Sequence, residues 1–186
     1  MRVISGSAKG IKLLSVPGKT TRPITDQVKE ALFNIIGFDV AGKFFLDLFG
    51  GTGAVGIEAL SRGAEHAVFL ETSYHAVKVI QKNLENTHLA SYATVLKKDA
   101  FAYLRELPTQ AFEFIYIAPP QYKSMWLKTM QALDENPNWV GQGETVIVQI
   151  HPKEFIEGQC YANFNEFDRR SYGSTLLIFY ERVSSE

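Results

Sequence analysis

The sequence has little of what builds covalent frameworks, metal centres or membrane spans. Its single cysteine, Cys160, excludes a disulfide framework, a CxxC motif and a cysteine-built zinc site. We expect no metal, because metal-ligand spacing is missing among His66, His75, His88 and His151. No apolar run approaches the roughly 18 residues of a bilayer span, and the N-terminus lacks a signal-peptide core. We therefore expect a cytoplasmic protein without a membrane partner, in which Cys160 is a small buried hydrophobe.

The composition is that of one globular domain, with 186 residues that are 46% hydrophobic and 21% charged. The net charge of −1 is unevenly spread, because residues 1–25 contain five basic side chains and no acidic one. The arm of residues 1–24 therefore differs in charge from residues 25–186, and we expect a monomer made of these two parts. The basic side chains of the arm are Arg2, Lys9, Lys12, Lys19 and Arg22.

The spacing of apolar residues is typical of strands at the N-terminus, and further along it switches between the spacing of helices and that of strands. Segments 2–5 and 11–16 flank a glycine-containing turn and predict a short N-terminal β-hairpin. Thr25 or Asp26 then begins a helix that Gly37 ends. Further strands are expected at 43–48, 66–70, 93–96, 112–117 and 145–150, helices at 54–62, 74–86, 100–107 and 125–133, and a terminal antiparallel hairpin at 160–167 and 175–181. This pattern predicts a Rossmann-like α/β fold with a seven-stranded, mostly parallel sheet.

A glycine motif follows the first strand of this predicted sheet. Gly51, Gly53 and Gly56 satisfy G-x-G-x-x-G, and Glu71 lies 20 residues after Gly51 at the end of the next strand. In an open parallel sheet, ligands bind beyond the carboxyl ends of the strands. By the motif alone, this is a dinucleotide site.

Asp47, at the tip of the first strand, argues for a different ligand. A pyrophosphate would meet like charge there, whereas a ligand with an ammonium and a sulfonium group would be attracted. S-adenosylmethionine has both groups, and we infer it as the cofactor. Glu71 would bind the ribose hydroxyls and Asp99 the adenine amino group. The predicted cofactor residues are Asp47, Phe49, Gly50, Gly51, Gly53, Glu71, Asp99 and Ala100.

Each carboxylate also has a purely structural explanation. Asp47 and Asp99 are each able to cap a helix, and Glu71 is able to stand in solvent at a strand end. Helix capping by Asp99 is compatible with ligand contact.

A double proline follows the fourth predicted strand and completes a resemblance to a known family. Pro119 and Pro120 favour an extended loop with free carbonyls, and Tyr122 is an aromatic suited to stacking on a planar base. Together with segments 21–35 and 47–64, this loop resembles the RsmD-type 16S rRNA guanine-N2 methyltransferases, over Met1 to about Tyr122. The resemblance implies methyl transfer from S-adenosylmethionine to the exocyclic N2 of a guanine in small-subunit ribosomal RNA.

The loop departs from the family pattern at one position. The family has Asp-Pro-Pro-Tyr where this chain has Ala118, Pro119, Pro120 and Gln121, and Tyr122 comes one place late. In the family, the Asp side chain and the first proline's carbonyl accept hydrogen bonds from the target amine. Here backbone carbonyls or Gln121 would have to serve, or activity is reduced or lost. The predicted catalytic residues are Pro119, Pro120, Gln121 and Tyr122.

The basic side chains of the arm suit contacts to RNA phosphates, which add affinity without reading sequence. An ordinary solvated charged face is the alternative. Arg22 and Lys29 flank the start of the first helix, where they are also candidates to meet the ligand's carboxylate. The expected partner is small-subunit ribosomal RNA or an assembling small subunit.

Three other functions remain open from the sequence. A DNA adenine amino-methyltransferase would use the same proline loop, and a catalytically silent RNA-binding relative would explain Ala118. An NAD-dependent oxidoreductase fits the glycine motif but conflicts with Asp47.

Overall fold

Strands and helices alternate along the chain. The computed structural model describes residues 1–17, 24–121 and 123–184. The strands are β1 (Phe44–Asp47), β2 (His66–Glu71), β3 (Ala93–Lys97), β4 (Phe112–Ile117), β5 (Val140–Ile150), β6 (Phe164–Tyr172) and β7 (Thr175–Arg182). The α-helices are α1 (Asp26–Ile36), α2 (Ala54–Ser61), α3 (Tyr74–Asn86), α4 (Ala100–Leu104) and α5 (Met125–Glu135). Short 3-10 turns occupy Gly37–Val40, Ala90–Tyr92, Pro137–Trp139 and Pro152–Glu154.

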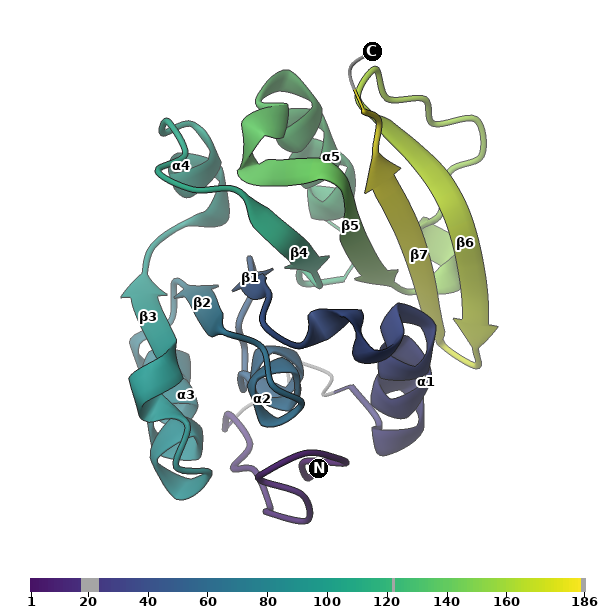
Figure 1. Cartoon of the computed structure of the whole chain (residues 1–186). Helices are drawn as coiled ribbons and strands as arrows, with labels where there is room; N and C mark the ends of the chain where they lie inside the picture. The colour runs from purple at the N-terminus through teal and green to yellow at the C-terminus, as the bar shows by residue number, and fades with distance from the viewer. Residues whose placement is uncertain (18–23, 122, 185–186) are drawn as a thin grey trace.

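The seven strands form one sheet in the order β3-β2-β1-β4-β5-β7-β6 (Figure 1). Strands β1 to β5 pair in parallel, whereas β7 runs antiparallel between β5 and β6. The predicted seven-stranded, mostly parallel sheet with a terminal antiparallel hairpin is confirmed. Its consequence is that the carboxyl ends of β1 to β4 share one edge, where ligands bind in such sheets.

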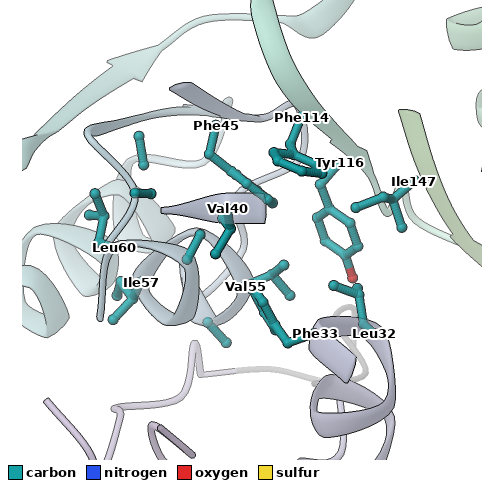
Figure 2. Close-up of a cluster of buried hydrophobic side chains, with 14 of the residues drawn as sticks. Leu32, Phe33, Val40, Phe45, Val55, Ile57, Leu60, Phe114, Tyr116 and Ile147 are labelled. Atoms are coloured by element: carbon teal, nitrogen blue, oxygen red, sulfur yellow. The ribbon is translucent and has the colours of Figure 1, made fainter. Parts of the chain in front are cut away.

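Helices cover both faces of the sheet and bury two apolar clusters. Buried side chains of α1, α2 and α3 pack on one face, and those of α4 and α5 pack on the other. Figure 2 shows part of the first cluster, in which Leu32 and Phe33 of α1 approach Tyr116 of β4 and Ile147 of β5. Thr25 caps α1 through a hydrogen bond from the Val28 N–H, as predicted.

The N-terminal arm folds back on itself beneath α2 (Figure 1). One antiparallel bridge joins Arg2 to Lys12, so the two predicted strands are reduced to a single paired position. Val3, Ala8 and Leu13 are buried in the same cluster as α1 and α2. The division of the chain at residue 24 stays a prediction.

Several predicted boundaries were wrong where charge or glycine hides the pattern. Strand β6 begins at Phe164 rather than residue 160. The prediction was wrong because most side chains of this edge strand are exposed and many are charged, so the strand has no apolar alternation. Strand β5 begins at Val140 instead of residue 145, and α4 ends at Leu104 rather than residue 107. The β6–β7 register shifts between Glu166 and Asp168, which marks a bulge in β6.

The expectation for the lone cysteine was also wrong, since Cys160 is exposed. It lies in the irregular segment that precedes β6, which buries little apolar surface. Among the described residues, no helix combines the length and the apolar character needed to cross a bilayer.

Candidate functional site

The glycine turn between β1 and α2 is shaped for close approach of a ligand. Gly51 and Gly53 adopt left-handed conformations with φ of 54° and 77°, which favour glycine. A Cβ added to Gly50 or Gly56 would collide with Ile80 or the Phe69 ring, so both glycines permit tight packing inside the protein. At Gly51 the nearest atom would be 3.9 Å away, so this glycine borders open space.

Glu71, at the tip of β2, holds the turn in place. Its Oε2 accepts a hydrogen bond from the Gly51 N–H at 3.0 Å, and its Oε1 accepts one from the Ser73 N–H at 2.8 Å. The Glu71 side chain is therefore not a simple solvated strand end. The Thr72 hydroxyl donates a third, longer hydrogen bond of 3.5 Å to Oε1. A carboxylate has about four lone-pair directions, so acceptor capacity for ligand hydroxyls remains, chiefly at Oε2.

Asp47, at the tip of β1, is a buried carboxylate with little internal compensation. It is 1% exposed, and its Oδ1 accepts one hydrogen bond, from the Phe49 N–H at 3.3 Å. Burial raises the pKa of Asp47 to about 7, and the nearby Glu71 charge adds to the rise. Among residues 1–17, 24–121 and 123–184, no basic side chain forms an ion pair with it. The described residues thus leave Asp47 without a paired positive charge, and a cationic ligand would supply one.

Asp99 and Ala100 begin helix α4 after β3. Asp99 is exposed, and its Oδ1 caps the helix by accepting from the Ala102 N–H at 2.9 Å. Asp99 therefore caps the helix, as its structural explanation predicted. Its second carboxylate oxygen remains able to accept a hydrogen bond from a ligand. Ala100 is buried, and Phe49 packs against the cluster of α4 and α5. All eight predicted cofactor residues therefore lie at the tips of three neighbouring strands, β1, β2 and β3.

The proline loop leaves β4 at the same edge of the sheet. Ala118, Pro119 and Gln121 are half-buried, and Pro120 is exposed. Tyr122, predicted to stack on a base, lies outside the described residues. The loop thus brings backbone carbonyls beside the tip of β1, which pairs with β4 through Asp47 and Tyr116.

Two residues near this loop were missed by the sequence analysis. The buried Tyr116 hydroxyl donates a hydrogen bond of 2.6 Å to Oε1 of Gln149 on the neighbouring strand β5. Burial and the Asp47 charge raise the pKa of Tyr116 well above its usual value, so the hydroxyl stays protonated. The sequence does carry one signal for Gln149, since it is a polar residue within the apolar stretch 146–150 of β5.

Buried charges fasten the basic arm to the helices. Glu58 of α2 is fully buried and accepts hydrogen bonds from the Ile4 and Ser5 N–H groups, at 2.8 and 3.0 Å. It also forms ion pairs with Lys29 and Arg62, at 3.1 and 2.8 Å. Lys29 donates as well to the Arg2 carbonyl. The suggestion that Lys29 meets a ligand carboxylate was wrong, because this ammonium is buried within the protein.

Three of the predicted RNA-binding residues, Arg2, Lys9 and Lys12, lie on the outside of the arm. Lys9 and Lys12 are exposed, and the Arg2 guanidinium forms an exposed ion pair with Asp26. Arg2 and Lys9 line a hollow of about 470 Å³ together with Arg62. Lys19 and Arg22 lie outside the described residues.

The edge formed by β1 to β4 accommodates a cationic ligand with ribose hydroxyls. It offers a buried carboxylate that no described cation pairs with, a second carboxylate with spare acceptor capacity, and a glycine turn bordering open space. A pyrophosphate would face Asp47 and Glu71 without a compensating charge from the described residues. Nowhere in the part of the chain that the structure describes do three His, Cys, Asp or Glu side chains gather as a metal site would require.

Comparisons with known proteins agree with this architecture. A model of the family described as conserved hypothetical protein 95 matches residues 1–181. Protein YlbH of Bacillus subtilis is 37% identical over 184 residues, covering 98% of this chain and 99% of that protein. Ribosomal RNA small subunit methyltransferase D of Escherichia coli K12 is 32% identical over 182 residues, covering 98% and 90%.

Solved structures share the fold over nearly the whole chain. The Escherichia coli protein yhhF superimposes with a TM-score of 0.88 at 28% identity, covering 100% of this chain and 99% of that one. An RNA methyltransferase from Salinibacter ruber, in complex with S-adenosyl-L-homocysteine, gives a TM-score of 0.67 at 15% identity, with coverage of 89% and 96%.

Proposed function

This chain belongs to the conserved hypothetical protein 95 family of RsmD-type methyltransferases, and from that premise we propose that it methylates the exocyclic N2 of a guanine in small-subunit ribosomal RNA, with S-adenosylmethionine as the methyl donor. One observation carries the assignment of the donor. Asp47 is a buried carboxylate beneath a glycine turn, and none of the described residues forms an ion pair with it. A ligand with a positively charged end compensates this carboxylate, whereas a dinucleotide adds negative charge.

Each residue at the edge has a defined task in this proposal. Asp47 attracts the positive end of the donor, Glu71 accepts from its ribose hydroxyls, and Asp99 accepts from its adenine amino group. Gly51 gives the donor room at the turn. When bound, S-adenosylmethionine supplies a methyl group already activated by a sulfonium, so no metal is needed.

The protein's main contribution to the rate is alignment of the two substrates. Carbonyls of the proline loop orient the amine, which is a poor nucleophile because its lone pair is delocalised into the guanine ring. Holding two reactants in line lowers a barrier by about 7–11 kcal/mol.

The arm is proposed to hold RNA by its phosphates. Lys9 and Lys12 are exposed, and Arg2, Lys9 and Arg62 line one hollow together with Glu30, so basic side chains outnumber the acidic one there. Such contacts position a nucleic acid without reading its sequence. The partner is either free ribosomal RNA or an assembling small subunit, and we keep the proposal of a monomeric, cytoplasmic enzyme.

A second candidate is favoured by Ala118. Without a carboxylate at this position, the chain would be an RNA-binding relative that keeps the donor site but transfers no methyl group. The structure of the donor site is the same in both cases, so only a measurement of methyl transfer separates them.

Titration calorimetry tests the donor first. We expect S-adenosylmethionine to bind and NAD not to bind detectably, and Glu71→Ala to weaken donor binding by about 1–3 kcal/mol through the lost hydrogen bonds. NAD binding that also depends on Glu71 would overturn the proposal.

Mapping of modified nucleotides in small-subunit RNA, from cells with and without this gene, tests the reaction. One N2-methylguanosine that disappears with the gene supports the proposed activity. An unchanged RNA favours the silent relative, and a lost methyl-adenine in DNA would assign the enzyme to a different substrate.

A further inference from the structure

Gln149 lies beside the position where the family's acceptor is missing. Strands β4 and β5 pair in parallel up to Ile117 and Val148, so Ala118 and Gln149 are the next residues along the two strands. Directly paired residues of a parallel sheet project to the same face, and neighbouring strands are about 4.8 Å apart. Ala118 and Tyr116 share that face because they are two residues apart, and the hydrogen bond from Tyr116 to Gln149 lies there too.

Gln149 is an exception within its strand. Its neighbours from Val146 to Val148 and Ile150 are buried and apolar, whereas Gln149 is half-buried at the edge that carries the glycine turn and the proline loop. Within residues 146–150, Gln149 is the single polar residue, so the aliphatic packing of this stretch does not require an amide. The side chain thus reaches the same end of the sheet as Asp47 and Ala118.

Tyr116 fixes the orientation of this amide. The buried hydroxyl donates to Gln149 Oε1 at 2.6 Å, and an amide oxygen has two lone pairs, so one acceptor direction remains. The same hydrogen bond turns the Gln149 amide nitrogen away from the phenol. The amide therefore presents one acceptor and a donor side by side.

We propose that Gln149 replaces the missing acceptor of Ala118. Its Oε1 accepts a hydrogen bond from the exocyclic amine of the target guanine, while its Nε2 donates to the unprotonated ring nitrogen N3. The inference rests on the proposed function. In this role Gln149 is a catalytic residue, because it contacts the reacting amine, and Tyr116 is a positioning residue that holds it.

The transfer step balances without a basic group at Gln149. The lone pair of the amine nitrogen forms the new C–N bond as the C–S bond breaks, and the electron pair of that bond stays on sulfur. The nitrogen then releases one proton to water, because an amide oxygen is too weakly basic to keep it. Gln149 contributes orientation of the lone pair toward the methyl group.

Single-turnover methyl transfer to small-subunit ribosomal RNA, at saturating S-adenosylmethionine, tests the proposal. We expect Gln149→Leu to slow transfer about 10- to 100-fold and Tyr116→Phe to slow it less, because only the first removes the acceptor. The dissociation constant of S-adenosylmethionine, measured by calorimetry, should stay within about twofold. Gln110→Leu, an exposed substitution in the turn before β4, is the matched control.

A double variant distinguishes a catalytic role of Gln149 from a role in packing alone. Adding Ala118→Asp to Gln149→Leu restores the family's acceptor, and we expect it to recover most of the lost rate. Packing damage would not be repaired by a carboxylate on the neighbouring strand. An unchanged rate for Gln149→Leu, or a slow rate without rescue, overturns the proposal.

Two further outcomes distinguish an error in the role of Gln149 from an error in the proposed function. Loss of transfer in Gln121→Ala, with a normal rate in Gln149→Leu, would assign the acceptor to the loop and overturn the role of Gln149 alone. A wild-type protein that binds S-adenosylmethionine but methylates neither guanine nor adenine in ribosomal RNA would overturn the proposed function and the role of Gln149 together.

Discussion

Two buried carboxylates, Asp47 beneath the glycine turn and Glu58 beneath the arm, differ in what surrounds them. Both are at most 1% exposed. Glu58 accepts from two backbone N–H groups and pairs with Lys29 and Arg62, whereas Asp47 accepts a single hydrogen bond of 3.3 Å. Burial of charge therefore does not by itself identify a ligand site.

The partners identify the role of each carboxylate. Glu58 is compensated within the chain, so its charge holds the arm on α1 and α2. Burial raises the pKa of Asp47 to about 7, and the described residues pair no positive charge with it, so a cationic ligand would compensate it. The first residue stabilises the fold, and the second costs stability in exchange for binding.

The largest expected effect comes from Glu58. Glu58→Gln leaves the buried Lys29 ammonium without its counter-charge, and we expect a loss of about 3–5 kcal/mol in the free energy of unfolding, measured by urea denaturation. Glu85→Gln is the control, because it breaks the exposed pair with Lys82 and should cost no more than about 1 kcal/mol. Equal effects of the two substitutions would remove the distinction between the carboxylates.

Asp47→Asn should act in the opposite direction on the ligand-free protein. The raised pKa of Asp47 means that its contribution to stability is present below about pH 4 and is lost as the pH rises through 7. We expect the free energy of unfolding of the variant to rise relative to that of the wild type across this interval, and to exceed it by about 2–4 kcal/mol above pH 7. Urea denaturation at several pH values measures the gain, and a pH-independent difference would contradict the raised pKa.

Donor binding should depend on the same titration. A positively charged ligand favours ionised Asp47, so affinity for S-adenosylmethionine should rise up to about tenfold per pH unit below pH 7 and level off above it. Calorimetry from pH 5.5 to 7.5 gives this slope. Asp47→Asn should bind weakly with no such slope, and a slope that persists in the variant would assign the titration to another group.

The smallest effect is expected at the surface of the arm. Replacing Arg2, Lys9 and Lys12 by Gln should weaken binding of any RNA and reduce the slope of log affinity against log salt by about 2–3. Filter binding at several salt concentrations measures both. Donor affinity should stay the same, and an unchanged salt slope would make the arm an ordinary solvated face.

The tips of the first three strands were predictable because their signals are local. Apolar runs locate Asp47 and Glu71 at strand ends, and the glycine spacing locates the turn between them. Glu58 and Gln149 were not identified, because the backbone donors to Glu58 and the Tyr116 donor to Gln149 lie 33 or more residues away in the sequence. Only the folded chain brings these groups together. The charged strand β6 was misplaced for a related reason, since an edge strand exposed on most positions lacks the apolar alternation that marks a strand.

The bulge in β6 affects how the sheet ends. As the last strand in the order, β6 carries backbone groups that another chain could extend by strand pairing, which is a common route to aggregation. The register shift between Glu166 and Asp168 interrupts that ladder, and Arg169 and Arg170 add charge along it. The edge therefore resists addition of a foreign strand and helps keep concentrated protein from aggregating.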